Sequence, residues 1–225
     1  MEQHNIKVIA HIRSDFPTKF GIPRQSGLVP ELRATVDFEP EFRSADALRG
    51  IEGFSHLWLI WQFSAAVRED WSPTVRPPRL GGNTRMGVFA TRSPFRPNPI
   101  GLSCVKLEGV GQEAEFGTVL YVSGADLMDG TPIYDIKPYL PYADSHSDAR
   151  GGFAPSPKET VAVDCPPELL ERLPQEQRSA LLGVLAQDPR PQYQDDPQRV
   201  YGMRFADFEV KFRVESGTLH VTEIE

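Results

Sequence analysis

Five arginines within one loop are the side chains best suited in this chain to bind an anionic or planar ligand. They lie in the stretch 76–101, RPPRLGGNTRMGVFATRSPFRPNPIG, which has no acidic residue although the whole chain carries a formal net charge of −7. Its five prolines and four glycines fix the backbone at some points and permit positive φ at others, which excludes a long helix or a central strand. A rigid, irregular loop of this kind presents guanidinium groups to a carboxylate, a phosphate or a purine face.

A second segment supplies carboxylates. In SGADLMDGTPIYDIKPYLPY, which begins at Ser123, Asp126 and Asp129 precede a Gly-Thr-Pro turn. The turn presents both carboxylates rigidly, either to a ligand or as the caps of a purely structural Asx turn between two strands.

Hydrolysis and metal chemistry are poorly supported. Cys104 lies in the alternating strand sequence LSCVKLE, where a buried, inert thiol is the ordinary outcome. Cys104 and Cys165 show no CxxC spacing, and the five histidines show no HxH or HExxH spacing. We therefore expect no disulfide framework, no nucleophilic cysteine and no metal site.

Length and composition are those of an ordinary soluble globular protein: 225 residues, 40% hydrophobic and 24% charged. No apolar run reaches the roughly 18 residues that span a bilayer, and the N-terminal sequence is not a secretory signal. We expect a cytoplasmic protein. Residues 158–225 hold eight basic and thirteen acidic residues, so most of the negative charge lies there and a basic patch for nucleic acid remains open in the central loop.

The elements that must position these residues are mainly strands. The pattern predicts strands over 5–13, around 32–38 and in IEGFSHLWLIWQF, with a short helix over 44–48 opened by a serine cap. Two more strands, 102–108 and 116–123, are joined through GVGQEAE. This connection matches GxGxxA, but the dinucleotide fingerprint needs a following helix, and we expect a hairpin instead.

Short strands with Gly and Pro punctuation predict a closed or nearly closed β-structure. The composition changes after a polar, proline-bearing segment. There the pattern predicts a helix over 174–187 and a hairpin of 200–214 with 219–224 around Ser216-Gly217. We expect a mainly β chain: residues 1–150 as the main domain, 151–159 as a linker, and 160–225 as a small α+β domain.

TVRPPRLGGNTRMGVFATRSPFRPNPIGLS, followed by DLMDGTPIYDIKPYLPYAD, closely resembles the TrmO family. Its members are S-adenosylmethionine-dependent tRNA (N6-threonylcarbamoyladenosine-37-N6)-methyltransferases. IRSDFPTKFGIPRQSGLV, DALRGIEGFSHLWLIWQF and LAQDPRPQY extend the resemblance over nearly the whole chain. It implies a single-sheet β-barrel as the main domain, S-adenosylmethionine as cofactor, and a homodimer that accepts the tRNA anticodon arm between its two central domains.

The resemblance also implies which residues surround the cofactor. Matching the motifs PRQ, SHLW, ATRS, IGxS and DLxDGTP gives Pro23, Arg24, Gln25, His56, Leu57, Arg92, Leu102, Asp126, Leu127, Met128 and Asp129.

Methyl transfer from a sulfonium needs donor and acceptor in line, exclusion of water and a nucleophilic acceptor nitrogen. In threonylcarbamoyladenosine the N6 nitrogen belongs to a urea, so a base that removes its proton is useful. Our candidates for the base and for contacts to the adenosine are Asp135, Lys137 and Tyr139, with Tyr142 as a further contact. Arg85 or Arg96 suits the threonyl carboxylate and Arg79 the tRNA, while the tyrosines and Phe95 suit stacking on an unpaired base.

Two alternatives stay open at this point. One is a methyltransferase of the same fold with another RNA or a small molecule as acceptor. The other is a protein that binds S-adenosylmethionine without turning it over.

Overall fold

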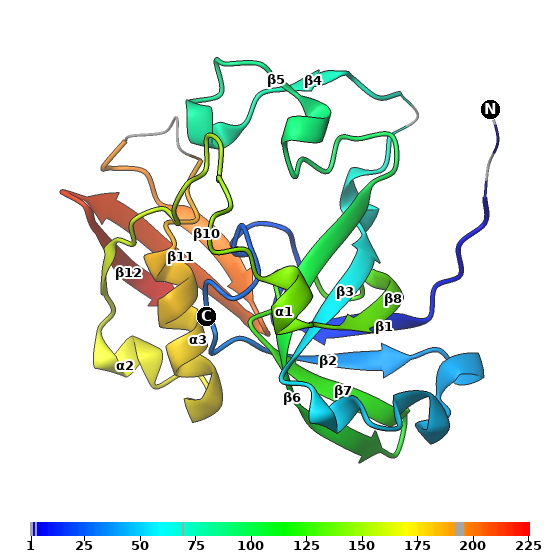
Figure 1. The fold of residues 1–225 in the computed structure, drawn as a ribbon. Coiled ribbons are helices and arrows are strands. Elements are labelled where there is room, and N and C mark those ends of the chain that lie inside the picture. Colours follow the sequence, from blue (N-terminus) through cyan, green and yellow to red (C-terminus); the bar gives the residue numbers. More distant parts are fainter. Residues whose placement is uncertain (1, 3, 69, 192–195) are drawn as a thin grey trace.

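The computed structural model describes the chain except residues 1, 3, 69 and 192–195, and strands dominate it (Figure 1). The strands are β1 (Ala10–Ser14), β2 (Arg33–Phe38), β3 (His56–Gln62), β4 (Thr74–Val75), β5 (Met86–Gly87), β6 (Ile100–Glu113), β7 (Gly117–Ser123), β8 (Pro132–Pro138), β9 (Ala162–Asp164), β10 (Tyr201–Phe205), β11 (Phe208–Glu215) and β12 (Thr218–Ile224). The α-helices are α1 (Pro141–Asp144), α2 (Pro167–Leu170) and α3 (Gln175–Ala186). Short 3-10 turns are η1 (Pro40–Phe42), η2 (Ala45–Leu48), η3 (Ile51–Gly53), η4 (Ser64–Ala66), η5 (Pro78–Leu80) and η6 (Val88–Ala90). The expected mainly β class is confirmed.

Six strands form the larger sheet, in the order β1-β2-β7-β6-β3-β8. Strand β8 pairs with β3 and also with β1, so the pairing returns to the strand at which it began. Because side chains alternate across each strand, one set fills the interior. Val36, Leu57, Leu59, Leu120 and Ile133 belong to it and are fully buried.

Strand β6 pairs with β3 along its first half and with β7 along its second half. Its residues 100–106 pair with β3, whereas its residues 106–113 pair with β7. Next to the first half of β6, a loop that contains Ser26 occupies the position of β7. There the Cys104 N–H donates to Ser26 Oγ at 3.1 Å. The sequence PRQS, residues 23–26, is therefore held against the edge of β6.

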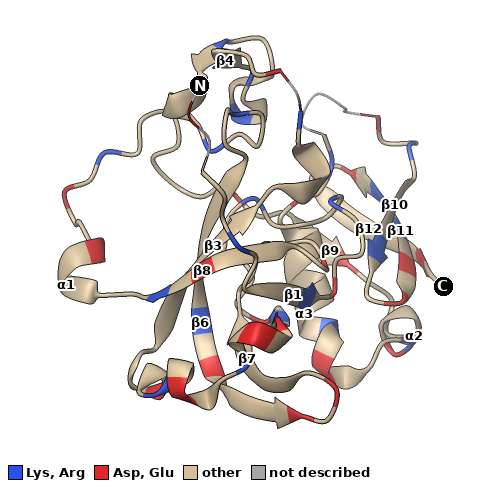
Figure 2. Cartoon of the chain, turned by 90° about the vertical axis from the view of Figure 1, so that its right-hand side faces the viewer, with Lys and Arg blue, Asp and Glu red and all other residues tan. Residues whose placement is uncertain are grey.

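The C-terminal part is a four-stranded sheet, in the order β10-β11-β12-β9, with α3 packed against it (Figure 1). Its core also takes Phe16, Val29 and Leu32 from the segment between β1 and β2. Strands β10–β12 carry both acidic and basic residues (Figure 2), and pairs such as Lys211 with Glu223 at 2.6 Å neutralise one another. The C-terminal sheet is thus not a uniformly acidic face.

Several expectations need correction. The first strand begins at Ala10 rather than residue 5, and the helix expected over 44–48 is the 3-10 turn η2, with no capping hydrogen bond from Ser44. The segment 200–214 is two strands, because Ala206 turns the chain at φ 49°. The hairpin in place of a dinucleotide fingerprint is confirmed, since β6 leads directly into antiparallel β7.

The helix expected over 174–187 and the turn at Ser216-Gly217 are also confirmed. No helix within the described ranges is long and apolar enough to cross a membrane. The domain boundaries at 150 and 160 stay predictions, and Gln192 and Tyr193 of LAQDPRPQY lie outside the described residues.

Candidate cofactor pocket

A pocket of about 750 Å³ lies at the end of the larger sheet where β3 ends and β6 begins. Four segments line it: the loop 22–25, the end of β3 with the residues after it, the loop 89–102, and the turn 126–131. The Phe63 N–H donates to the Pro99 carbonyl at 2.8 Å and so joins two of these segments. Trp61, Phe63 and Met128 supply apolar wall, and the Trp61 and Phe63 ring centroids lie 4.3 Å apart.

The floor of the pocket, by which we mean Trp61, Ser103 and Asp126, is a chain of hydrogen bonds. The buried Trp61 Nε1–H donates to Ser103 Oγ at 2.9 Å, and the Ser103 hydroxyl donates to Asp126 Oδ1 at 2.5 Å. Gly101 stands opposite Trp61 in the β3–β6 register, where a Cβ would come within 2.3 Å of the indole ring. Only glycine at this position leaves room for the indole to lie across β6 and to donate its hydrogen bond to Ser103.

Two opposing influences act on the ionisation of the Asp126 carboxyl. Burial raises the pKa of its carboxyl, while the Ser103 hydrogen bond and the positive charge of Arg92 act in the opposite direction. A ligand that brings positive charge or hydroxyl donors to this carboxylate is therefore favoured.

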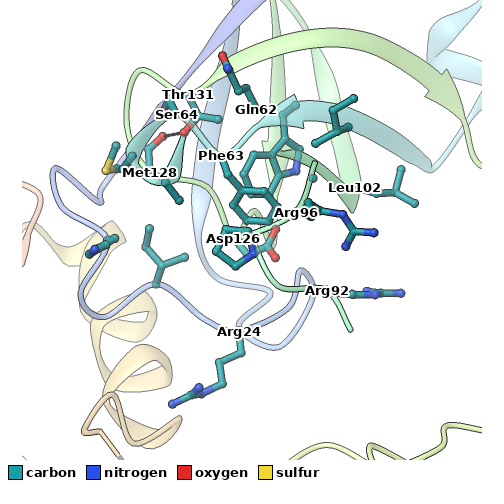
Figure 3. Close-up of a pocket in the computed structure, with 18 of the residues that line it drawn as sticks. Arg24, Gln62, Phe63, Ser64, Arg92, Arg96, Leu102, Asp126, Met128 and Thr131 are labelled. Carbon is teal, nitrogen blue, oxygen red and sulfur yellow. Dashed lines mark hydrogen bonds between the residues drawn. The ribbon is translucent and has the colours of Figure 1, made fainter. Parts of the chain in front are cut away.

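The rim of the pocket, by which we mean Arg24, Arg92 and Arg96, is basic. Arg92 Nη1 donates to Gln25 Oε1, and Arg96 Nη1 donates to the Thr91 carbonyl at 3.0 Å. In Figure 3, Arg92 and Arg96 lie to one side of the Asp126 carboxylate, Met128 and Thr131 lie to the other, and Arg24 extends away from it. A carboxylate inside and guanidinium groups at the edge complement a zwitterionic ligand that carries its own carboxylate.

Most of the residues expected around the cofactor meet in this pocket. Its lining includes Pro23, Arg24, Gln25, Arg92, Leu102, Asp126 and Met128, together with Arg96 from the expected substrate set. Four others lie elsewhere. Leu57 and Leu127 belong to the buried interior of the larger sheet, Asp129 Oδ1 accepts the Ser14 N–H at 2.9 Å, and His56 is at the other end of β3.

The expected catalytic residues lie along β8 and just after it, at increasing distance from the pocket: Asp135 is opposite Ile60, Lys137 is opposite Trp58, and the Tyr139 N–H donates to the His56 carbonyl. Strands β3 and β8 are antiparallel, and β3 alone separates Gln62 at the pocket from His56 by about 20 Å. Lys137 pairs with Asp135 at 2.8 Å, and the Tyr139 ring lies 5.8 Å from that of Trp58.

The remaining expected substrate residues lie outside the pocket lining. Tyr142 is 86% exposed on α1. Arg79 donates to the Ser156 carbonyl, and Arg85 Nη1 donates to Thr74 Oγ1 at 3.1 Å.

Sequence reasoning missed the pocket's inner residues. Trp61, Phe63, Ser64 and Thr131 line it, and Ser103 stands behind Asp126. The strand IEGFSHLWLIWQF was predicted, but its pattern gives no sign that its last residues face a ligand. The pairing of Trp61 with Gly101 is the missing information, and it is a contact between distant parts of the chain.

A small-molecule pocket that combines a half-buried carboxylate with an arginine rim, built on a sheet that is not doubly wound, suits a cofactor-binding enzyme outside the dinucleotide-binding folds. Two family models match the chain: "tRNA-methyltransferase O N-terminal domain" over residues 11–145 and "TrmO C-terminal domain" over residues 158–225. The chain belongs to the TrmO family, as its motifs predict.

Individual proteins similar to this chain support the same family assignment. The chain is 43% identical to the tRNA (adenine(37)-N6)-methyltransferase of Escherichia coli K12, covering 100% of this chain and 99% of that protein. It is 46% identical to the putative S-adenosylmethionine-dependent methyltransferase RcsF of Pseudomonas aeruginosa, covering 92% and 91% of the two chains. The crystal structure of TrmO from Pseudomonas aeruginosa superposes with a TM-score of 0.81 at 38% identity, covering 100% of this chain and 99% of that one.

Proposed function

We propose that this protein transfers a methyl group from S-adenosylmethionine to N6 of threonylcarbamoyladenosine at position 37 of tRNA. One observation carries the proposal: Asp126 and Arg92 line a single pocket, in a chain similar over its whole length to a tRNA (adenine(37)-N6)-methyltransferase. The turn 126–131 and the loop 89–102, distant in sequence, therefore serve one ligand.

The pocket fits S-adenosylmethionine. Its volume of about 750 Å³ is within the usual range for a bound small molecule. Asp126 suits the ribose hydroxyls or the amino group, Arg92 and Arg96 suit the carboxylate, and Trp61, Phe63 and Met128 exclude water from the remainder. When bound, the cofactor supplies an electrophilic methyl group on a sulfonium that is already a good leaving group.

The mechanism also needs a base for the acceptor nitrogen. Asp135, Lys137 and Tyr139 are our proposed residues, and Lys137 and Tyr139 lie toward the other end of the sheet, about 13 to 20 Å of strand from Gln62 at the pocket of the same chain. We propose a homodimer in which this end of one protomer completes the pocket of its partner. Exposed Ile100 and Leu102 at the pocket edge are apolar surface for such a contact.

The shared site is tested by mixing two variants, each of which we expect to be inactive alone. Asp126→Ala damages the pocket and Lys137→Met damages the proposed catalytic end. In an equal mixture of co-refolded chains, half of the dimers are mixed and each keeps one intact site, so about a quarter of the activity should return. Activity no greater than that of the separate variants would exclude sharing.

We further propose that the ring of six strands is the single-sheet β-barrel expected from the sequence, that residues 160–225 form the α+β domain, and that the protein works in the cytoplasm. The function itself is tested with purified protein, S-adenosylmethionine and tRNA that carries threonylcarbamoyladenosine. Mass spectrometry of the digested tRNA should then detect threonylcarbamoyladenosine that carries one additional methyl group. Methyl transfer to another nucleoside, or cofactor binding without transfer, would select one of the two alternatives.

A further inference from the structure

Two exposed aromatic rings lie at the outer edge of the pocket, and no role in cofactor binding has been assigned to either. Trp71 is 52% exposed and Phe89 is 73% exposed, and their ring centroids lie 6.2 Å apart with 30° between the planes. They belong to a flap, residues 71–91, in which β4 pairs with β5 (Figure 1). Phe89 also lines the pocket, so the pair continues its wall outward.

The backbone holds this pair outward. Val88 is 1% exposed, and its N–H donates to the Pro73 carbonyl at 2.9 Å, which joins the two sides of the flap next to both rings. The Thr91 hydroxyl donates to the Val88 carbonyl at 2.8 Å and closes the turn η6. Within this turn Val88 is buried, whereas the Phe89 ring is exposed to solvent.

The surroundings indicate what covers these rings. The stretch 76–101 has five arginines and no acidic residue, and nearby the Arg68 guanidinium lies 3.9 Å from the Phe95 ring centroid. Exposed aromatic faces among guanidinium groups are the surface that binds single-stranded nucleic acid, since bases stack on the rings and phosphates meet the cations. Glu69 and Asp70, which precede Trp71 in the sequence, are the exceptions to this positive charge.

We propose that Trp71 and Phe89 form a stacking platform for an unpaired base of the anticodon loop, adjacent to the adenosine that enters the pocket. This inference rests on the proposed function and adds the residues that hold the neighbouring nucleotide. A base has a flat apolar face whatever its identity, so the platform fixes the position of the loop without choosing a sequence.

Trp71 is the residue to change, because it lies outside the pocket lining. Trp71→Ala should raise the KM for tRNA by about tenfold, while the cofactor Kd measured by calorimetry and the kcat at saturating tRNA stay within twofold. Trp71→Phe should keep most of the affinity. Trp71→Leu keeps apolar bulk without an aromatic face and should resemble Trp71→Ala. Val200→Ala, another exposed apolar site, is the control and should change nothing.

Three results would overturn the platform. They are an unchanged KM for tRNA in Trp71→Ala, equal affinity in Trp71→Leu and Trp71→Phe, or loss of the dimer in Trp71→Ala by sedimentation at unchanged tRNA affinity, which would assign the rings to a second copy. If Trp71→Ala fails to fold, the comparison of Trp71→Leu with Trp71→Phe decides the question. A wild-type protein that does not methylate threonylcarbamoyladenosine in tRNA would refute the proposed function instead.

Discussion

The floor and the rim of the pocket hold their polar groups in different ways. On the floor, Trp61, Ser103 and Asp126 bond to one another in series, and the first two are 7% and 1% exposed on paired strands. On the rim, Arg92 is exposed and bonds to Gln25, a side chain of another loop.

This difference separates two tasks. A floor whose side chains are hydrogen-bonded to one another has its geometry before the ligand arrives, so binding there costs little reorganisation and selects one small molecule closely. Exposed guanidinium groups are easily redirected and suit a large, flexible, negatively charged partner. We therefore expect substitutions on the floor to act on cofactor binding. Substitutions farther out along residues 76–101, the arginine loop, should act increasingly on tRNA binding.

The largest effect should follow from Asp126→Ala. Loss of the only pocket-lining carboxylate among the described residues leaves the cationic and hydroxyl groups of the ligand without a partner, and we expect the Kd for S-adenosylmethionine to rise by about 100-fold. Isothermal titration calorimetry measures this. Asp129→Ala is the matched variant: if the carboxylate that caps Ser14 matters equally for the cofactor, the assignment of the floor is wrong.

Gly101→Ala should come next. Its Cβ would meet the Trp61 indole at 2.3 Å, so the indole must move and its bond to Ser103 breaks. Overpacking of this kind costs about 1–3 kcal/mol of stability, and cofactor affinity should fall although no cofactor-binding side chain is removed. Gly53→Ala meets no atom within 4 Å and serves as the control in thermal unfolding and in titration. An unchanged cofactor Kd in Gly101→Ala would show that the floor is not rigid.

Arg92→Ala tests the inner rim. Removal of this guanidinium takes away a charge-assisted partner for the ligand carboxylate and releases Gln25. We expect the Kd for S-adenosylmethionine to rise about tenfold. Arg92→Lys keeps the charge without the planar fork and should recover only part of the affinity. Full recovery would mean that charge alone is recognised there.

The arginine loop and the floor were unequally visible in the sequence. The loop stands out because charge and backbone stiffness are local properties, readable from 26 consecutive letters. The floor depends on register: Trp61 opposes Gly101, and Ser103 reaches Asp126, only after β3, β6 and the turn 126–131 have come together. Alternation along β6 predicted a strand but not that Ser103 would stand behind a carboxylate.

For Lys137 and Tyr139, proximity to Asp126 in the sequence does not mean proximity in space. Lys137 follows Asp126 by only eleven positions, but β8 is extended and carries the chain away from the pocket at about 3.3 Å per residue. A one-chain site was the natural expectation from DLMDGTPIYDIKPY, and strand geometry is what places its two halves apart.

Arg79→Ala tests the outer end of the arginine loop and should have a smaller effect. Arg79 is exposed, bonds to the Ser156 carbonyl and does not line the pocket, so cofactor affinity should stay unchanged. The affinity for tRNA should fall several-fold, and the slope of log K against log salt should become shallower by about 1, as for loss of one phosphate contact. If Arg79→Ala instead weakens cofactor binding and leaves the salt dependence of tRNA binding unchanged, the inner and outer arginines have been assigned the wrong way round.

The smallest effect concerns protons at Asp126. Because burial raises the pKa of this carboxyl in the free protein, its contribution to folding is present at low pH and is lost as pH rises through the raised pKa. A cationic ligand favours the ionised form, so cofactor binding near that pKa should release a fraction of a proton, and binding well above it should release none. Calorimetry in two buffers of different ionisation enthalpy measures the proton count. Asp126→Asn should bind weakly, release none, and unfold with a flatter pH profile. Proton uptake by the wild-type protein would mean that the carboxylate is not the group that meets the positive charge of the ligand.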